Sequence, residues 1–388
     1  MALNTEIMKT KFSYLLKRMY MRVYAISHPI QDKTILFSSF NGLQYSDNPR
    51  AISEKMHEMY PDYHIRWIID RERDQYHLIP DYVDCIPSEG KKKFQAIATA
   101  HCYVYNMNLR NTLIKRKGQF FVQTWHGDRN FKKILYEVWE NGQKRPYPVM
   151  DNKFTDVAVA GSTYCEEKYH SAFHYYGKIA MTGSPKVDNM LANDPDIQHQ
   201  IKKRLNLDIK TRILLYAPTF REGNSADFKI PLDLGRVLKT LCNKTGDNWV
   251  CLVRAHPGVS GFNVSNADGM RDVTDYPDMA DLLTVTDFLI TDYSNTILDF
   301  YLTGKPAVCY IADKEEYVRN SRSLKNDPES IGAVCVRTEQ ELENVIMTHT
   351  EEDYARAYRN IDKYYGTKEK GDAAEKVAGI IDKALRHV

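Results

Sequence analysis

A segment near residue 290 joins an apolar run to polar residues that could bind an anion. Its sequence, DFLITDYSNTILD over Asp287–Asp299, predicts a buried strand at Phe288–Thr291 that Asp292 closes. Three polar residues then open the following predicted helix: Ser294, Asn295 and Thr296. Free backbone N–H groups and hydroxyl side chains at a helix start suit a diphosphate. An ordinary N-cap uses the same residue types, so the segment alone leaves both interpretations open.

The segment Val250–Pro257 brings an arginine and a histidine to the end of another predicted strand. Arg254 and His256 could both donate hydrogen bonds to phosphate oxygens, and arginine can donate two in parallel. Pro257 restricts His256 to an extended backbone. A purely structural His–Pro turn is the alternative.

The segment Gln123–Gly127, reading QTWHG, ends a third predicted strand in a histidine followed by glycine. His126 has the side chain best suited to act as a base near neutral pH. Four charged residues follow and could receive a phosphorylated or membrane-bound acceptor: Asp128, Arg129, Lys132 and Lys133. A core histidine beside a solvated basic face is the alternative.

Two further strand ends combine small residues and proline with a cation. Ile213–Ala217 leads to Thr219 and Arg221, and Ile179–Thr182 leads to Lys186. Several strand ends with phosphate-compatible chemistry are less expected by chance than any one of them.

These residues need a framework of parallel sheets to bring them together. Short β-rich runs alternate with helical stretches, which predicts parallel sheets with right-handed crossovers. The predicted strands are Thr34–Phe40, His64–Asp70, His101–Asn106, Phe120–Trp125, Val157–Gly161, Ile179–Thr182, Ile213–Ala217, Trp249–Arg254, Phe288–Thr291 and Ala307–Ile311. The predicted helices include Pro49–Met59, Lys91–Ala100 and Thr163–Phe173. Ligands bind beyond the carboxyl ends of strands in open parallel sheets, where the polar residues above are expected to lie.

Length and composition limit the classes of protein to which this chain can belong. A chain of 388 residues favours two domains, with the polar stretch Leu191–Gln200 as the expected boundary. The net charge of +2 and the absence of an aromatic and basic array give no support for a nucleic-acid partner. Seven cysteines without zinc-ligand or CxxC spacing indicate reduced thiols. No uncharged apolar stretch is long enough to span a membrane.

The N-terminal residues 1–30 contain a basic amphipathic stretch, Lys9–Ile30, in which lysines and arginines alternate with apolar and aromatic residues. Helices of this composition can lie in an anionic membrane surface. The alternative, equally weighted from composition, is a helix that packs on the body of the protein.

Taken in order, seven motifs resemble those of the CDP-glycerol glycerophosphotransferase family, the teichoic acid primases and polymerases. They are FNGLQYSDNPRAI, QTWHG, GSPKVDNM, LLYAPTFRE, RAHP, ITDYSNTILDF and KPAVCYIADKEEY. Each motif is weak alone, whereas the ordered set covers most of the chain. This chain departs from the family pattern in having Asp128-Arg129 where a Thr-Pro-like pair is expected, Lys186 in place of arginine, and Asn295-Thr296 after Ser294.

The resemblance implies an α/β protein of the GT-B fold, with two Rossmann-like domains facing a central cleft. Residues 31–190 would form the acceptor domain and residues 191–388 the CDP-donor domain, with a last helix that packs back on the first domain. The resemblance implies a peripheral membrane enzyme that acts at the cytoplasmic face on a lipid-linked acceptor. A homo-oligomer is one expected form of the enzyme. His126 would act as the base, and His256 would serve the donor phosphates.

The expected reaction moves glycerol phosphate, or another polyol phosphate, from a CDP-polyol to the acceptor and releases CMP. The donor contacts would come from the residues named at the strand ends: Lys186, Thr219, Arg221, Arg254, Asp292, Ser294, Asn295 and Thr296. No cofactor is expected, apart from Mg²⁺ brought by the donor phosphates. Two alternatives remain: a GT-B glycosyltransferase that uses a nucleotide sugar, and a non-catalytic membrane scaffold with the same fold.

Overall fold

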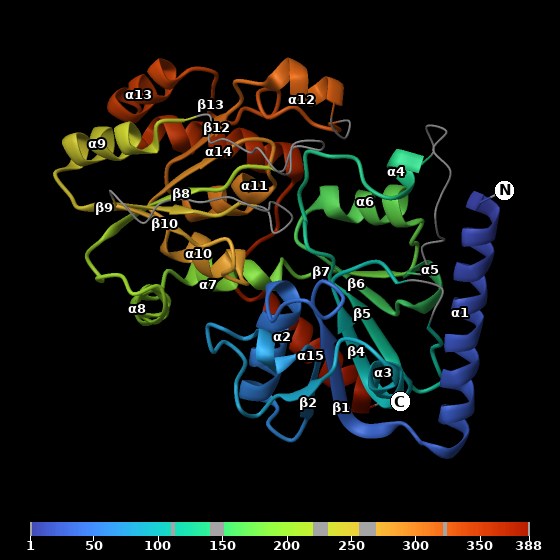
Figure 1. Ribbon diagram of the computed structural model, residues 1–388. Coiled ribbons are helices and arrows are strands. Elements are labelled where there is room, and N and C mark those ends of the chain that lie inside the picture. The colour runs from blue at the N-terminus through green and yellow to red at the C-terminus, as the bar shows by residue number, and fades with distance from the viewer. Residues whose placement is uncertain are drawn as a thin grey trace. The chain divides into compact units, whose positions relative to one another are not determined.

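The chain forms two compact units, each with its own parallel sheet (Figure 1). The computed structural model describes residues 2–109, 113–139, 151–219, 232–255, 269–320 and 324–386. Unit 1 contains Met1–Asp128, Ile134–Asp188 and Lys368–Val388. Unit 2 contains Arg129–Lys133 and Asn189–Thr367. The short segment Arg129–Lys133 therefore belongs to unit 2, although the chain on either side of it belongs to unit 1.

The sheet of unit 1 has seven parallel strands in the order β3-β2-β1-β4-β5-β6-β7. They are β1 (Gln31–Ser38), β2 (His64–Ile68), β3 (Asp84–Ile86), β4 (Ala100–Tyr105), β5 (Phe120–Gln123), β6 (Val157–Ala160) and β7 (Lys178–Met181). The order of the strands reverses between β1 and β4. Open α/β sheets bind ligands beyond the strand ends at such a reversal.

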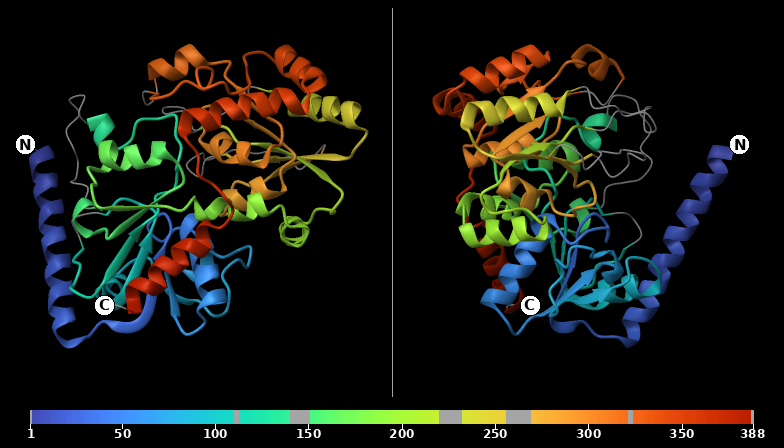
Figure 2. Two further views of the ribbon diagram at one scale, coloured as in Figure 1. Left: turned by 180° about the vertical axis from the view of Figure 1, so that it is seen from behind. Right: turned by 60° about the vertical axis from the view of Figure 1, so that its left-hand side comes forward.

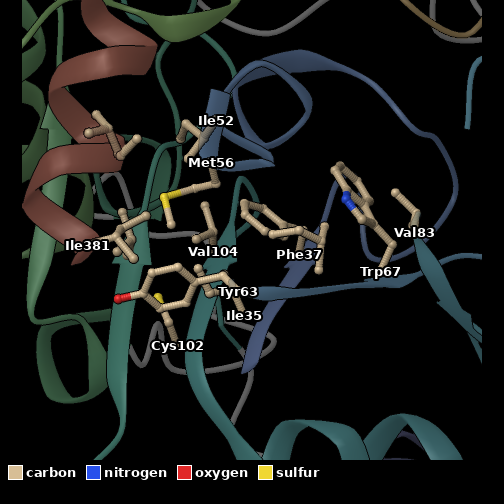
Figure 3. Packing of buried hydrophobic residues seen from close by; sticks show 14 of the residues in the cluster. Ile35, Phe37, Ile52, Met56, Tyr63, Trp67, Val83, Cys102, Val104 and Ile381 are labelled. Carbon is tan, nitrogen blue, oxygen red and sulfur yellow. The ribbon is translucent and has the colours of Figure 1, made fainter. Parts of the chain in front are cut away.

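Helices cover both faces of this sheet. They are α1 (Ala2–Ser27), α2 (Asp47–Met59), η1 (Arg71–Arg73), α3 (Lys91–Thr99), α4 (Tyr136–Trp139), α5 (Asp151–Phe154), α6 (Thr163–Phe173), η2 (Pro185–Val187) and α15 (Ala373–Arg386). Successive residues of β1 alternate between the faces: Ile35 and Phe37 join the core under α2 and α15, and Leu36 joins the core under α3. Figure 3 shows the first of these cores, in which Ile381 of α15 packs near Met56 of α2.

Two helices at the ends of the chain complete unit 1. The last helix, α15, packs on α2, and the view from behind in Figure 2 shows it in red across the sheet. The first helix, α1, lies against α3 through Met21, which is fully buried. Within the described part of the chain, no helix is both long and apolar enough to cross a membrane.

The sheet of unit 2 repeats the same plan with six parallel strands in the order β10-β9-β8-β11-β12-β13. They are β8 (Arg212–Tyr216), β9 (Trp249–Val253), β10 (Met270–Asp272), β11 (Phe288–Thr291), β12 (Ala307–Tyr310) and β13 (Cys335–Val336). Every residue of β11 and β12 is buried, as expected for central strands covered on both faces. The strand order reverses between β8 and β11.

The helices of unit 2 are α7 (Asp188–Ala192), α8 (Pro195–Arg204), α9 (Leu234–Thr245), α10 (Met279–Val285), α11 (Thr296–Phe300), η3 (Tyr301–Thr303), α12 (Lys314–Asn320), α13 (Glu339–Thr348) and α14 (Glu351–Tyr365). The stretch Leu191–Gln200, predicted as a boundary, is largely helical. Asp194 accepts a hydrogen bond from the Asp196 N–H and starts α8, with Pro195 at its first position.

The strands predicted from sequence are all present within a few residues of their expected bounds. Three strands were not predicted: β3, β10 and β13. Each has two or three residues and, at the edge of its sheet, lacks the long apolar run that marks a central strand.

Candidate functional site

The turn after β5 places His126 at the carboxyl edge of the unit 1 sheet. Trp125, just before it, has a left-handed backbone with φ of 50°, which is rare for a bulky side chain. Hydrogen bonds hold this conformation: the Trp125 N–H donates to the Gln123 side chain at 2.8 Å, and Asn48 Nδ2 donates to the Trp125 carbonyl at 3.1 Å. Strained backbone of this kind persists only where its surroundings fix it, and it clusters at functional sites.

The ring of His126 has a defined tautomer. Its Nδ1 lies 2.8 Å from the backbone carbonyl of Asn106. Because a carbonyl can only accept, Nδ1 carries the proton, and Nε2 of the neutral ring holds a lone pair. Among the described residues Nε2 has no hydrogen-bond partner. Trp125 and Phe40 flank the ring, with centroids 4.0 and 5.4 Å away.

The surroundings of His126 favour its neutral form. Burial lowers the pKa of His126 below its ordinary value, and the nearby positive charges of Lys186 and Lys168 lower it further. The Asn106 carbonyl and the Asp47 carboxylate act in the opposite direction but do not outweigh burial. A neutral imidazole with an open Nε2 is the state that a general base requires.

Asn106 links the ends of β1 and β4, where the strand order of unit 1 reverses. It is fully buried; its Oδ1 accepts from the Phe40 N–H at 2.8 Å, and its Nδ2 donates to Asp47 at 3.2 Å. Its own carbonyl accepts from His126. Asn106 was not singled out from the sequence, although its place at the end of the predicted strand His101–Asn106 was a usable signal.

Lys186 lies beside His126 within unit 1. Its ammonium donates to the His126 carbonyl at 2.9 Å and lies 3.6 Å from the Asp47 carboxylate, with both side chains about nine-tenths buried. Asn48 Oδ1 accepts from the Lys186 N–H at 3.0 Å. These contacts give Lys186 a clear part in holding the backbone of His126, and its predicted contact with the donor stays a prediction.

The first two charged residues after His126, Asp128 and Arg129, are buried. Asp128 is buried, and its Oδ1 accepts from the Gly161 N–H at 2.6 Å. The Arg129 side chain is 0% exposed and pairs with Asp299 at 3.2 Å inside unit 2. Protein contacts thus hold part of each charged group in the interior, and the predicted contact of both residues with the acceptor stays a prediction.

Lys132 and Lys133 are half-buried in unit 2. The Lys132 ammonium lies 5.6 Å from the centre of the Tyr317 ring, and its backbone forms an antiparallel bridge with Leu324. Their predicted contact with the acceptor stays a prediction.

In unit 2, Asp292 and Thr219 meet where the strand order reverses. Asp292 follows β11, is buried, and accepts from the Thr219 N–H through both carboxylate oxygens, at 2.9 and 3.0 Å. Thr219 follows β8. The carboxylate therefore fixes the start of the loop after β8. Asp292 thus positions Thr219, and its predicted contact with the donor stays a prediction.

The three polar residues at the start of α11 make hydrogen bonds within the protein. Ser294 Oγ accepts from the Thr296 N–H at 3.3 Å and lies 2.8 Å from Thr296 Oγ1. Asn295 Oδ1 accepts from the Phe131 N–H at 3.1 Å. The helix they open has five residues and continues as η3 to Gly304, which has a left-handed backbone with φ of 72°. Ser294 therefore makes a local contact with the first residue of the helix, and the predicted contact of these residues with the donor stays a prediction.

Arg254 is a buried cation of unit 2 with few contacts among the described residues. It follows β9 and is 9% exposed. Among the described residues, its side chain has one hydrogen bond, a long one of 3.4 Å to the Pro277 carbonyl. Burial lowers the pKa of Arg254 to about 10, against the nearby charge of Asp278. A buried guanidinium with so few acceptors suits an anionic ligand.

Two predicted site residues, His256 and Arg221, lie outside the described residues. Within the described ranges, no group of three or more histidine, cysteine, aspartate or glutamate side chains is arranged to hold a metal ion.

Comparison with known proteins decides the family. The sequence profile of the family described as CDP-Glycerol:Poly(glycerophosphate) glycerophosphotransferase matches residues 19–383. The chain belongs to this family. The resemblance seen in the seven motifs is thereby confirmed, and the chain is a transferase of glycerophosphotransferase type.

Individual members of the glycerophosphotransferase family agree with this assignment. The chain is 30% identical to a teichoic acid poly(glycerol phosphate) polymerase of Bacillus spizizenii, over 95% of this chain and 97% of that protein. It is 27% identical to a protein of the same description from Staphylococcus epidermidis, over 92% of this chain but 51% of that protein. The solved structure of the wall teichoic acid polymerase TagF matches with a TM-score of 0.80 and 23% identity, over 99% of this chain and 98% of that one. That likeness confirms the predicted GT-B class of fold.

Proposed function

We propose that this chain transfers glycerol phosphate from CDP-glycerol to a hydroxyl group of a lipid-linked, teichoic acid-type acceptor and releases CMP. The family assignment supports the donor and the acceptor class. The single observation that supports the mechanism is the tautomer of His126, because its protonated Nδ1 is bound to Asn106 and its Nε2 is open.

In the proposed step, the acceptor oxygen attacks the phosphorus atom that bears the glycerol. A new phosphorus–oxygen bond forms, and the bond from that phosphorus to the oxygen of CMP breaks. The acceptor proton passes to Nε2 of His126, and CMP leaves with the electron pair as a phosphate anion. Arg254 neutralises charge on the diphosphate. Such transfers depend mainly on positioning and electrostatic stabilisation.

In this proposal Arg254 is the main contact of the donor diphosphate, and Thr219, Thr296, His256, Arg221 and Lys186 are further expected contacts. We propose no metal held by the protein alone; Mg²⁺ would enter with the donor phosphates. Chelation with and without added Mg²⁺ tests this point.

The direct test is a donor screen on a panel of lipid-linked acceptors, with mass analysis of the products. CDP-glycerol should give one CMP for each glycerol phosphate added, in preference to CDP-ribitol. Release of UDP or GDP from a nucleotide sugar would instead favour a glycosyltransferase. Tight binding of CDP-glycerol without turnover on any acceptor would favour a non-catalytic scaffold.

We also propose that the protein works as a peripheral protein at the cytoplasmic face of the membrane, bound through α1. Six apolar side chains of this helix are about half exposed or more: Phe12, Leu15, Leu16, Met19, Val23 and Ile26. At 3.6 residues per turn they form one stripe roughly 100° wide. The opposite face packs on α3, where Gln95 donates to the Tyr20 hydroxyl at 2.8 Å. A helix fixed on one side, with an apolar stripe and basic flanks, suits an anionic lipid surface.

A further inference from the structure

Lys168 is a buried cation close to the proposed base. It lies in the middle of α6, and its side chain is fully buried in unit 1. A buried ammonium is costly unless hydrogen bonds replace its water. Its Nζ donates to the backbone carbonyl of Asp128 at 2.6 Å and also to that of Gly127.

These two carbonyls directly follow the carbonyl of His126, which accepts from Lys186 at 2.9 Å. Two buried lysines thus hold three consecutive carbonyls of the turn that carries the proposed base. Asp128 adds a further tie, because its carboxylate accepts from the Gly161 N–H at 2.6 Å. The peptide planes after His126 are therefore fixed by side chains from α6 and η2.

We infer that Lys168 is a positioning residue for His126, which it serves by clamping the Gly127 and Asp128 carbonyls so that Nδ1 stays on Asn106 and Nε2 stays open. This inference rests on the proposed role of His126 as the base. Lys168 makes no contact with the reacting nitrogen.

The charge of Lys168 has a second consequence. A positive charge near the ring disfavours the imidazolium, and Lys168 contributes in this way to the lowered pKa of His126. The charged and titratable groups that surround the ring and the clamp are Asp47, Asp128, Tyr164, Cys165, Lys168 and Lys186. Without the positive charge of Lys168, the negative charge of Asp128 near the ring is less compensated. The pKa of His126 should therefore rise.

The test is Lys168→Met, with Lys202→Met as the matched control. Lys202 in α8 is also buried and also clamps two backbone carbonyls, those of Ile209 and Thr211, both at 2.8 Å, but it belongs to unit 2. Turnover of CDP-glycerol with the acceptor is measured against pH in the full chain, after both variants are shown to be folded by circular dichroism.

We expect Lys168→Met to lower turnover about 100-fold, the scale of a small misplacement of a catalytic group. The acidic limb of its pH profile should move to higher pH, while Lys202→Met keeps the wild-type profile. If Lys168→Met does not fold, Lys168→Gln keeps an N–H donor without the charge and should show the same displaced limb.

Two outcomes separate this inference from the proposed function. If folded His126→Ala keeps near-normal turnover, the proposed base is wrong. If His126→Ala is inactive but a folded Lys168 variant has wild-type turnover and an unmoved acidic limb, the inference about Lys168 is overturned and the base survives.

Discussion

The carboxyl edges of the two sheets differ in the hydrogen bonds that hold their proposed site residues. At the edge of unit 1, side-chain donors hold backbone carbonyls: Lys168, Lys186 and Asn48 all donate to the turn around His126. At the edge of unit 2, side-chain oxygens hold backbone N–H groups. Asp292 accepts from Thr219, and Asn295 accepts from Phe131.

The two edges therefore leave different groups available to a ligand. In unit 1 the carbonyls of His126, Gly127 and Asp128 are occupied, whereas Nε2 of His126 has no hydrogen-bond partner among the described residues. In unit 2 the Thr296 N–H at the start of α11 is occupied by Ser294, so this N–H is a poorer diphosphate ligand than a free one. The positive charge that binds the donor diphosphate is then expected to come mainly from side chains, and chiefly from Arg254.

The largest expected effect comes from removing the open nitrogen of unit 1. His126→Ala should lower turnover about 10²–10⁴-fold, the usual contribution of a general base. The matched control is His170→Ala, because Nδ1 of His170 also lies 2.9 Å from a backbone carbonyl, that of Tyr175. Turnover of CDP-glycerol with the acceptor is the measurement. Equal losses in the two variants would contradict a special role for His126.

A large effect on stability is expected from breaking the buried ion pair between Arg129 and Asp299. Asp299→Leu leaves the charge of Arg129 poorly compensated in the interior of unit 2 and should cost about 3–5 kcal/mol in the free energy of unfolding. The double variant Arg129→Leu with Asp299→Leu should recover much of that loss. Urea denaturation of the three proteins measures both values. If Asp299→Leu is as stable as the wild type but loses affinity for the acceptor, the structural role given to Arg129 is wrong.

A smaller effect is expected from removing the cation of unit 2. Arg254→Met should weaken CDP-glycerol binding roughly 10- to 150-fold, since a hydrogen bond to a charged group contributes about 1.5–3 kcal/mol. The control is Arg271→Met, because Arg271 Nη1 donates to the carbonyls of Leu205 and Asn206 at 2.8 and 2.9 Å. Calorimetry with CDP-glycerol measures both. A wild-type affinity in folded Arg254→Met would remove Arg254 from the donor site.

The pH profile should reflect the lowered pKa of His126. A base with a lowered pKa stays neutral at mildly acidic pH, where an ordinary histidine already takes up a proton. Turnover should therefore persist below pH of about 6.5 and then fall about tenfold for each further unit of acidification. Rate measurements from pH 5 to pH 8, with stability checked at each point, test this. An acidic limb above the ordinary histidine range would contradict it.

The smallest effect is expected at the membrane surface. Replacing Leu16, Met19 and Val23 by serine removes the centre of the apolar stripe of α1 and should weaken binding to anionic vesicles about tenfold. Met347→Ser is the control, because Met347 in α13 is similarly exposed, at 52%. Vesicle co-sedimentation measures the binding. Unchanged binding by the triple variant would show that α1 is not the membrane contact.

Sequence patterns predicted the elements and the strand ends better than the contacts among them. His126, Asp292 and Arg254 were placed correctly after their strands, because apolar runs that end in polar residues are local signals. The segment Thr163–Phe173 was predicted as a helix with its observed bounds.

What the sequence could not predict was how distant residues meet. Lys168, in the run TYCEEKYHSAF, reads as a solvated charge, and its burial depends on where a turn 40 residues earlier lies. Arg129 likewise sits in a basic run that suggests a surface, and only the fold places it beside Asp299. Asn106 joins three segments through tertiary contacts that no local pattern encodes.

The contrast between the two edges is tested most directly by measuring donor affinity and turnover together in His126→Ala and Arg254→Met. Calorimetry gives the dissociation constant for CDP-glycerol, and the rate of CMP release at saturating donor gives turnover with the acceptor. We predict that folded His126→Ala binds CDP-glycerol with near wild-type affinity but turns over about 10²–10⁴-fold more slowly. Arg254→Met should instead show a clear loss of donor affinity. If His126→Ala loses donor affinity while it keeps its turnover, the division of roles between the two edges is wrong.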